Sequence, residues 1–401
     1  MRATRPILPD LPASPAVRIA ALAYLAHLLC EGWIGSSEAF LGIALVAAVV
    51  AWKRGELTVP FHPLYVPLAI FVAASVVSAA ASFRPFVSLL NANEWFGFLT
   101  LPLALALYSR FPQVRRYGVG ALLALVLFQS AVGATQFLFL GHDALEKRIT
   151  GTTAHVMTYS GIVLPLSLLF LSLGASRLRR PLYLLAAAAG SLAVALSFTR
   201  GAWLGWMVGV LVLVLLRRPR AMVWLVPVLI LAITFSPLPL FARLVSSFDF
   251  RQTSVLDRIR MVEGGIEIIR DRPLLGVGPA NVKEIYPLYR KDDAPRFRIP
   301  HLHSNPVQLW AERGVLALAA YLALQVLFLA AMLARRRDPD LRPWAEAGIA
   351  TALALFVAGL FEFNFGDTEV LLTSLDIWAL ALLPPPGPAA NPQAPPVVLA
   401  P

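Results

Sequence analysis

The feature that most constrains this chain is a succession of apolar runs separated by short charged segments. About twelve runs can be recognised, most of them near the about 17–25 residues that a helix needs to cross a bilayer. Those at 37–52, 94–109, 201–216 and 369–383 are the shortest. The others lie at 18–35, 64–82, 117–140, 155–175, 181–199, 221–240, 306–334 and 344–363.

The composition agrees with a membrane setting. Hydrophobic residues make up 58% of the chain and charged residues only 14%, with a mean hydropathy of +0.71, which excludes a water-soluble globule of this size. We therefore predict an all-α polytopic membrane protein with about twelve transmembrane helices and one large helical extracytoplasmic loop. The single cysteine, Cys30, excludes an internal disulfide and indicates neither a metal nor a redox site.

The basic residues between the runs predict the topology. The net charge of +11 would suggest a nucleic-acid partner in a soluble chain, but here the basic residues form clusters in alternate connections, so none is expected. One set of connections holds eighteen of them: Arg2, Arg5, Arg18, Lys53, Arg54, Arg110, Arg115, Arg116, Arg177, Arg179, Arg180, Arg217, Arg218, Arg220, Arg335, Arg336, Arg337 and Arg342. The opposite short loops hold four: Arg84, Lys147, Arg148 and Arg200. By the positive-inside rule the first set is cytoplasmic, and so are both termini.

These assignments divide the chain into five parts. A polar cytoplasmic leader covers 1–17 and shows no cleavable signal peptide. Nine transmembrane helices follow in 18–240, then an extracytoplasmic loop at 241–305 and three further transmembrane helices in 306–383. The cytoplasmic tail at 384–401 is rich in proline and alanine, and we expect it to be disordered.

The loop at 241–305 has mixed charge and a helical pattern. It carries eleven Lys or Arg and eight Asp or Glu residues. An apolar stripe typical of an amphipathic helix is formed by Val255, Ile259, Val262, Ile266 and Ile269. A turn at 276–279 and a second short helix from Asn281 to Tyr289 are expected to follow. The loop is interpreted either as a cap with its stripe in the membrane interface or as the roof of an active site.

Two histidines, His301 and His303, end this loop just before the apolar run at 306–334. Asn305 is expected to be the N-cap of that helix, Pro306 its first residue and Gln308 the partner in a capping box. A helix of this length spans roughly 43 Å against about 30 Å of hydrocarbon, so its first turns should stand above the bilayer. The positive helix end disfavours imidazolium, so His303 should be neutral and suited to act as a general base.

Several blocks of this chain resemble the O-antigen ligase/polymerase superfamily. They are Ser-Phe-Thr-Arg-Gly-Ala-Trp-Leu-Gly at 197–205, Asp-Arg-Ile-Arg-Met-Val-Glu at 257–263, Asp-Arg-Pro-Leu-Leu-Gly-Val-Gly-Pro-Ala-Asn at 271–281, and His-Leu-His-Ser-Asn-Pro-Val-Gln-Leu at 301–309 with its trailing Glu-Arg-Gly. A further block, Arg-Ile-Thr-Gly-Thr-Thr-Ala-His-Val-Met-Thr-Tyr-Ser-Gly at 148–161, is similar to another superfamily segment. Together they extend over roughly 145–330.

The resemblance implies a membrane glycosyltransferase with a fold similar to the GT-C class, in the bacterial inner membrane with its active site facing the periplasm. The donor would be a glycan on a polyprenyl diphosphate, and the acceptor would be a lipid-anchored or other glycan. Membrane lipid would surround the protein. No cofactor or metal is implied, and no Asp-x-Asp pair on the outer loops indicates one. The Gly276 and Gly278 pair forms a turn rather than a nucleotide site, because Pro279 removes a donor and no lysine follows.

The resemblance also suggests site residues. His303 matches the superfamily's histidine, although Ser304 intervenes before Asn305, so His301 is the alternative base. Arg258 matches a motif arginine, the alternative being a residue on a solvated helix face or in an ion pair with Asp257.

Arg200 opposes the charge rule and suits a diphosphate, the alternative being an interface anchor. His155 would help to shape the site or bond a backbone carbonyl, and Asn305 and His301 would assist substrate binding. Arg260 is expected to be structural.

Three functions compete. The preferred one is an O-antigen ligase that moves a finished glycan onto lipid A–core by metal-independent inverting transfer. The second is a polymerase of O-antigen or exopolysaccharide, with a protein O-glycosyltransferase as a variant. The third is a transporter, for which ionisable residues deep in spans would be expected, and only Glu31 and the group from Glu362 to Glu369 are candidates.

Overall fold

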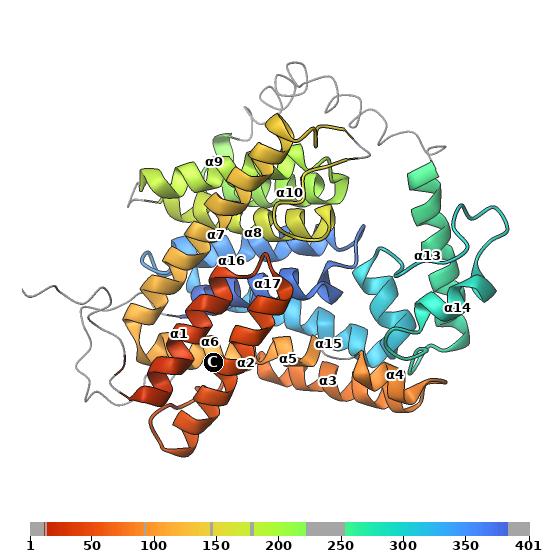
Figure 1. Cartoon of the computed structure of the whole chain (residues 1–401), viewed down its shortest axis with the longest axis horizontal. Coiled ribbons are helices and arrows are strands. Elements are labelled where there is room, and N and C mark those ends of the chain that lie inside the picture. Colours follow the sequence, from red (N-terminus) through yellow and green to blue (C-terminus); the bar gives the residue numbers. More distant parts are fainter. Residues whose placement is uncertain are drawn as a thin grey trace, which may run out of the picture.

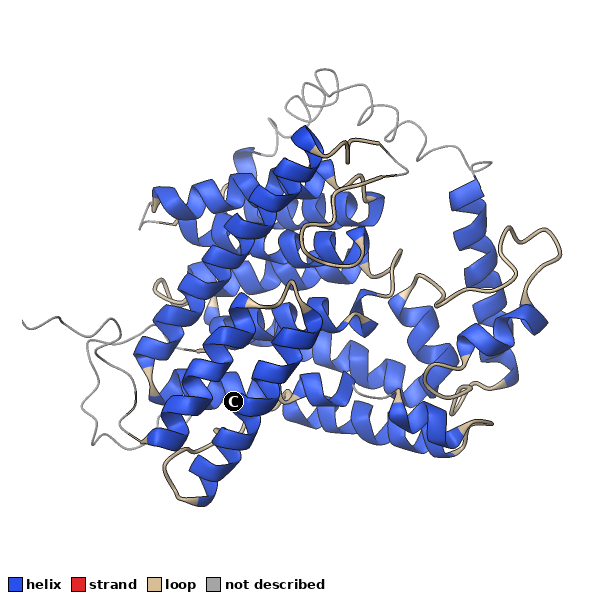
Figure 2. Cartoon of the chain, in the orientation of Figure 1, coloured by secondary structure: helices blue, strands red, loops and turns tan. Residues whose placement is uncertain are grey.

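The computed structural model describes residues 12, 14–91, 94–144, 147–176, 180–221 and 253–383. These residues form helices joined by loops, with no strand among them, as expected for an all-α protein (Figures 1 and 2). Outside the described residues lie the expected span at 221–240 except Ala221, the segment 241–252, the tail at 384–401, and residues 1–11 and 13 of the leader. The end of the expected leader is helical, because α1 begins at Pro15.

The first group of helices comprises α1 (Pro15–Leu29), α2 (Ile34–Lys53), α3 (Tyr65–Ala80), α4 (Pro85–Leu90), α5 (Glu94–Phe98), α6 (Thr100–Arg110) and α7 (Pro112–Phe139). The second comprises α8 (Val156–Gly174), α9 (Pro181–Leu196), α10 (Arg200–Arg217) and the short 3₁₀ helix η1 (Pro219–Ala221). The third comprises α13 (Thr253–Asp271), α14 (Val282–Tyr289), α15 (Asn305–Arg335), α16 (Arg342–Ala358), the 3₁₀ helix η3 (Asn364–Gly366) and α17 (Thr368–Leu382).

Five of the described helices are both long and apolar enough to cross a membrane: α2, α7, α8, α10 and α15. Three apolar helices, α1, α3 and α9, are shorter. The chain is therefore a multi-pass membrane protein, but the expected number of twelve spans is not confirmed. The expected span at 94–109 is instead two short helices, α5 and α6, separated at Leu99. The run at 344–363 is helical only as far as Ala358, so Glu362 lies in the loop beyond it.

Proline fixes the start of many helices, because its backbone angle suits the first turn and its missing N–H costs nothing there. It occupies one of the first two positions of α1, α4, α7, α9, α15 and α16. The helix α8 lies at the centre of the bundle, where it packs against α9, α16, α10 and α17. Most of its residues are buried, which explains why it is apolar on every side.

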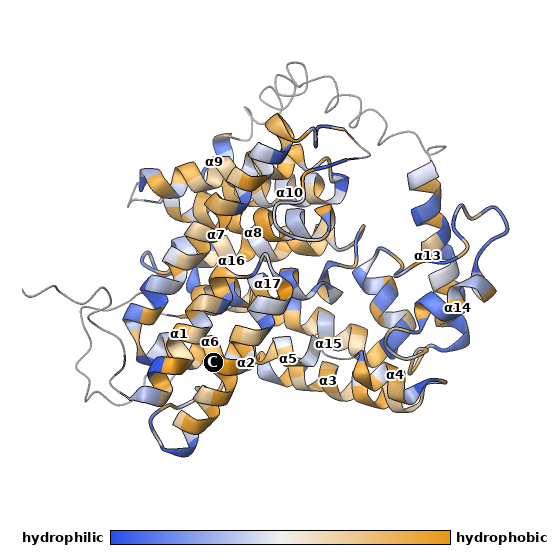
Figure 3. Ribbon diagram, in the orientation of Figure 1, coloured by the Kyte–Doolittle hydropathy of each residue, from blue (hydrophilic) through white to orange (hydrophobic). Residues whose placement is uncertain are grey.

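Helices α13 and α14 stand at one end of the bundle, and hydrophilic residues gather there (Figures 1 and 3). The two expected loop helices are thus confirmed. The expected apolar stripe is only partly the buried face, since Ile259 and Ile266 are exposed. The face that packs against α14 and α15 carries Met261, Ile268 and two glycines, and a Cβ at Gly265 would meet Val307 at 2.5 Å. Close helix contact therefore decides which face is buried.

The helix α15 contains a kink at Gly314, which has φ 78° and ψ 177°. The kink frees carbonyl groups of the preceding turn, and these accept hydrogen bonds from outside the helix. Val277 N donates to Ala311 O at 2.9 Å, and Gly278 N donates to Glu312 O at 2.8 Å. The glycine turn after α13 is therefore attached to the first part of α15, which holds the end of the loop in place.

Candidate active site

The loop that carries the two histidines enters α15 one residue earlier than the sequence predicts. Ser304 is the N-cap and Asn305 is the first helical residue, so the assignment of Asn305 as the cap is wrong. The backbone N–H of Asn305 donates to Gly359 O at 2.7 Å, which attaches the start of α15 to the end of α16. Gln308 does reach back, but its Oε1 accepts from Leu302 N at 2.8 Å rather than from the cap.

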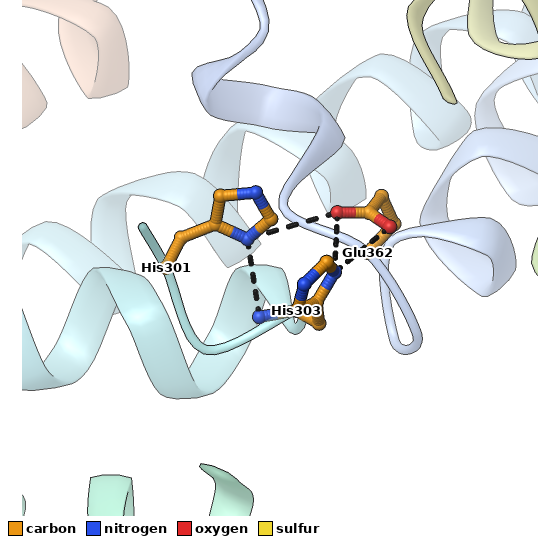
Figure 4. Close-up of side chains that lie close together, drawn as sticks. All are labelled: His301, His303 and Glu362. Carbon is orange, nitrogen blue, oxygen red and sulfur yellow. Dashed lines mark hydrogen bonds and ion pairs between the residues drawn. The ribbon is translucent and has the colours of Figure 1, made fainter. Parts of the chain in front are cut away.

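The main feature of the site is a carboxylate beside His303. Glu362, from the loop between α16 and η3, places Oε1 2.8 Å and Oε2 3.0 Å from His303 Nδ1 (Figure 4). His301 lies next to His303, with its Nδ1 3.7 Å from the same Oε1 of Glu362 and the two ring centroids 4.2 Å apart. The His303 and Glu362 side chains are only 16% and 15% exposed, so their charges interact in an environment with little water.

Asn305 holds the two loops of this site together. Its Nδ2 donates to Asn364 Oδ1 at 2.6 Å, and its Oδ1 accepts from Phe365 N at 3.0 Å. Both partners follow Glu362 closely in the chain. Because Asn305 is 2% exposed and its side chain is engaged in these bonds, the structure favours a positioning role over the expected contact with substrate.

The hydrogen bonds assign the tautomers of both rings. His301 Nδ1 accepts from the backbone N–H of His303 at 3.3 Å, so its proton belongs on Nε2. His303 Nδ1 faces a carboxylate, which only accepts, so this nitrogen carries the proton. The Nε2 lone pair of His303 is then able to accept a proton. In addition, His303 has φ +51°, a left-handed backbone conformation that is costly for such a side chain and is often found at functional sites.

The electrostatics separate the roles of the three residues. Burial would raise the pKa of the Glu362 carboxyl, but the hydrogen bond with His303 and electrostatic interactions with His303, His301 and Arg258 hold it below its ordinary value. Glu362 therefore stays ionised. Burial is the main reason that the pKa of His301 is lowered to about 4. His303 and nearby arginines also act to lower it, whereas Glu362 acts to raise it. His301 is accordingly a weak base at neutral pH, which favours His303 for proton transfer.

Arginines surround this carboxylate. Arg258 on α13 donates to the carbonyl of Phe361, and its Nη2 lies 3.5 Å from Glu362 Oε2. Arg200, the first residue of α10, is close enough to Arg258 for their positive charges to interact. Arg148 interacts with both Arg258 and Glu362, and burial with the Arg258 charge lowers its pKa. Arg258 and Arg148 thus lie near the carboxylate and Arg200 lies near Arg258, a concentration of cations that suits an anionic ligand.

Arg148 and Glu362 are the two residues that sequence analysis did not propose for the site. The Nη1 atom of Arg148 is buried and has no hydrogen-bond partner among the described residues, so it offers a donor to a ligand. Arg148 begins the block that resembles the superfamily at 148–161, and that signal could have identified it. Glu362 lies 59 residues from His303 in an interrupted apolar run, and no local pattern marks it.

Neighbouring charges on α13 and in its loop have other partners. Asp257 forms an ion pair with Arg296 at 3.0 Å, so it does not occupy Arg258 as the alternative interpretation required. Arg260 bonds Glu263 at 2.7 Å and Asp293 at 2.6 Å, in agreement with the structural role expected for it. Of the two arginines in this stretch, Arg258 therefore faces the histidine–carboxylate pair.

A pocket opens beside this pair. Its lining includes Arg258 and Glu362, together with the starts of two helices: Met157, Ser160 and Gly161 on α8, and Thr199, Gly201 and Ala202 around the start of α10. His155 is the N-cap of α8 and is exposed at the same helix end, without a cap hydrogen bond from its side chain. Its expected part in shaping the site stays a prediction.

The ligand atoms of His301, His303 and Glu362 lie within 4.8 Å of one another, close enough to hold a metal ion. Arg258 lies beside the same carboxylate and repels a cation. The surroundings therefore suit an anion better than a metal.

These observations define a class of protein. It is a helical, multi-pass membrane protein with a histidine–carboxylate pair and an arginine cluster at one end of its bundle. Residues 184–322 match the family model described as O-antigen ligase. This match confirms the resemblance of the motifs and supports the O-antigen ligase superfamily for this region of the chain. The match includes His303 and Arg258, whereas Arg148 and Glu362 lie outside it. No curated protein sequence matches the chain significantly.

Proposed function

We propose that this protein transfers a glycan from a polyprenyl diphosphate, such as undecaprenyl diphosphate, to a sugar hydroxyl, as an O-antigen ligase of lipopolysaccharide biosynthesis. The observation that carries the proposal is the contact of His303 Nδ1 with the Glu362 carboxylate at 2.8 Å. It leaves Nε2 of the ring as a base, and Arg258 lies beside the same carboxylate. The family match at 184–322 supports the same class of reaction.

The arginines fit a diphosphate. A guanidinium group donates two parallel hydrogen bonds to phosphate oxygens and stays charged at any physiological pH. Arg258 and Arg200, with Arg148, would bind the two phosphates and stabilise the charge that develops as the carrier departs. In this role they replace a divalent cation, so the proposed reaction needs no metal.

The histidine and the carboxylate fit the transfer of one proton. As the acceptor oxygen forms its bond to the anomeric carbon, the bond from that carbon to the diphosphate oxygen breaks. The acceptor proton moves to His303 Nε2, and Glu362 stabilises the resulting imidazolium. Attack from the face opposite the leaving group inverts the anomeric centre. Since the proton ends on the ring, water must later remove it to restore the base.

The acceptor is the part of the proposal that the site constrains least. We propose lipid A–core, as for a ligase. With a repeat unit as acceptor the same chemistry would make a polymerase of O-antigen or exopolysaccharide, and with a protein side chain an O-glycosyltransferase.

The basic residues of the short loops support an orientation with both termini in the cytoplasm of the inner membrane and the site in the periplasm.

The test is a transfer assay with purified protein and an undecaprenyl-diphosphate-linked glycan. We expect glycan-modified lipid A–core and free undecaprenyl diphosphate when both substrates are present, and neither with a His303→Ala variant. Longer glycans made from the donor alone would assign a polymerase. Movement of an intact donor across a vesicle, without release of the diphosphate, would identify a transporter and contradict the proposal.

A further inference from the structure

A second group of ionisable side chains lies inside the bundle, apart from the site with His303. His27 is near the end of α1, Glu31 is in the turn before α2, and Asp376 is on α17. All three side chains are 0% exposed. Burying such groups in an apolar bundle is costly unless their charge is neutralised, so this group needs an explanation.

Three atoms of the group face one another. His27 Nε2 is 3.4 Å from Asp376 Oδ2, and the ligand atoms of all three residues lie within 4.8 Å of one another. Three buried atoms, His27 Nε2, Asp376 Oδ2 and Glu31 Oε1, have no hydrogen-bond partner in the described parts of the chain. Buried polar atoms without partners are rare, and three that converge on one point indicate a missing positive species.

The opposite atom of each side chain is held by a different hydroxyl residue. Thr373 Oγ1 donates to Glu31 Oε2 at 2.6 Å, and the Tyr24 hydroxyl donates to Asp376 Oδ1. His27 Nδ1 lies 3.1 Å from the Ser37 carbonyl oxygen and 2.8 Å from its hydroxyl. These bonds fix the direction of each side chain, as outer residues do around metal ligands.

The partners of His27 are compatible with a metal-binding tautomer. Nδ1 can accept from the Ser37 hydroxyl or donate to the Ser37 carbonyl oxygen. With the proton on Nδ1, the lone pair of Nε2 points toward the Asp376 carboxylate 3.4 Å away, and a cation between the two atoms would bind both. A neutral imidazole with Nδ1 bonded to a carbonyl and Nε2 free is the form that binds metals.

Distance and charge point to the same kind of cation. With metal–ligand bonds of about 2.0–2.1 Å, neighbouring ligands of a tetrahedral zinc site are about 3.3 Å apart, close to the separation of the His27 and Asp376 atoms. Two carboxylates and a neutral imidazole carry two negative charges. One divalent cation makes the buried group neutral, whereas a monovalent cation leaves one charge uncompensated.

We propose that His27, Glu31 and Asp376 bind one divalent transition-metal cation of the zinc class. The nitrogen ligand favours such a metal over magnesium or calcium, which prefer oxygen alone. The cation would join α17 to the turn between α1 and α2 and so stabilise the bundle. It lies apart from the proposed transfer reaction, and no step of that reaction depends on it.

The test is the metal content of the whole protein, purified in detergent without chelators and washed with metal-free buffer. We expect about one equivalent of zinc-class metal per folded chain. Asp376→Asn, which keeps the shape of the ligand but not its charge, should retain less than about a tenth of it. Glu38→Gln, a carboxylate of the same hairpin outside the group, is the matched control and should keep the metal.

A second variant separates this site from the histidines of the transfer site. Glu362→Gln should also keep its full metal content, and loss of the metal there would place it at His303 instead and overturn the proposal. If Asp376→Asn does not fold, X-ray absorption of the wild-type metal decides, because the proposal requires one imidazole nitrogen with carboxylate oxygens. Wild-type protein that purifies without metal would show that protons neutralise the group, and the proposal would fail.

Discussion

Replacement of Glu362 by glutamine tests how the base works. The variant keeps the size of the side chain but removes the charge that faces His303 Nδ1 at 2.8 Å. Two unit charges about 4 Å apart interact by about 4 kcal/mol at an effective dielectric constant of about 20. A hydrogen bond to a charged group contributes about 1.5–3 kcal/mol. We expect a loss of about 3 kcal/mol in the transition state, because the imidazolium forms only as the acceptor proton moves.

This energy corresponds to a fall of about 100-fold in the rate of transfer. The assay is single-turnover release of undecaprenyl diphosphate from saturating donor, with donor affinity measured separately. Affinity should change little, since the carboxylate does not bind the diphosphate. The matched control is Glu263→Gln, which removes a carboxylate that bonds Arg260 on the same side of the molecule and should leave the rate unchanged. A Glu362→Gln rate within about threefold of wild type would refute the role of Glu362.

Three further predictions concern binding, stability and topology. Arg258→Ala should weaken donor binding and transfer at least tenfold, with poor rescue by lysine because the bidentate fork is lost, while Arg260→Ala stays active. The pKa of His301 is lowered to about 4, so between pH 6.5 and 4 the unfolded chain binds more protons than the folded chain, and stability falls as pH falls through this window. In His301→Gln the decrease of Tm over this range should be smaller, and a decrease equal to that of the wild type would contradict the burial argument. In a cysteine-free background, an impermeant thiol reagent added to intact cells should label Asp292→Cys and spare Arg54→Cys, and the reverse pattern would invert the orientation.

Local sequence patterns were sufficient for the parts of the site that depend on one helix end. His303 is marked by its place before α15, and Arg258 by its place on an amphipathic helix. The partner of each could not be predicted in the same way. Glu362 reaches His303 only because α16 stops at Ala358 and the following loop turns back over α15, and these contacts join residues 59 positions apart.

The fold shows the same limit. Apolar runs predicted most helices, since their length and composition are local properties. The kink at Gly314 was missed because its freed carbonyls are satisfied by the turn at Val277 and Gly278, far along the chain. The break between α5 and α6 divides an apolar run in which Pro102 has no N–H to donate to the carbonyl of Phe98, so here the sequence did carry a local signal. At Gly314, by contrast, tertiary partners of the backbone decided the outcome.

The central claim is that His303 is the base and His301 supports it. The direct measurement compares transfer by His303→Ala and His301→Ala with purified lipid-linked donor at neutral pH. Loss of a general base costs about 100- to 10,000-fold, so His303→Ala should fall in that range and His301→Ala should lose far less, with donor binding retained in both. An inactive His301→Ala with an active His303→Ala would reverse the roles, and two active variants would contradict base catalysis by either ring.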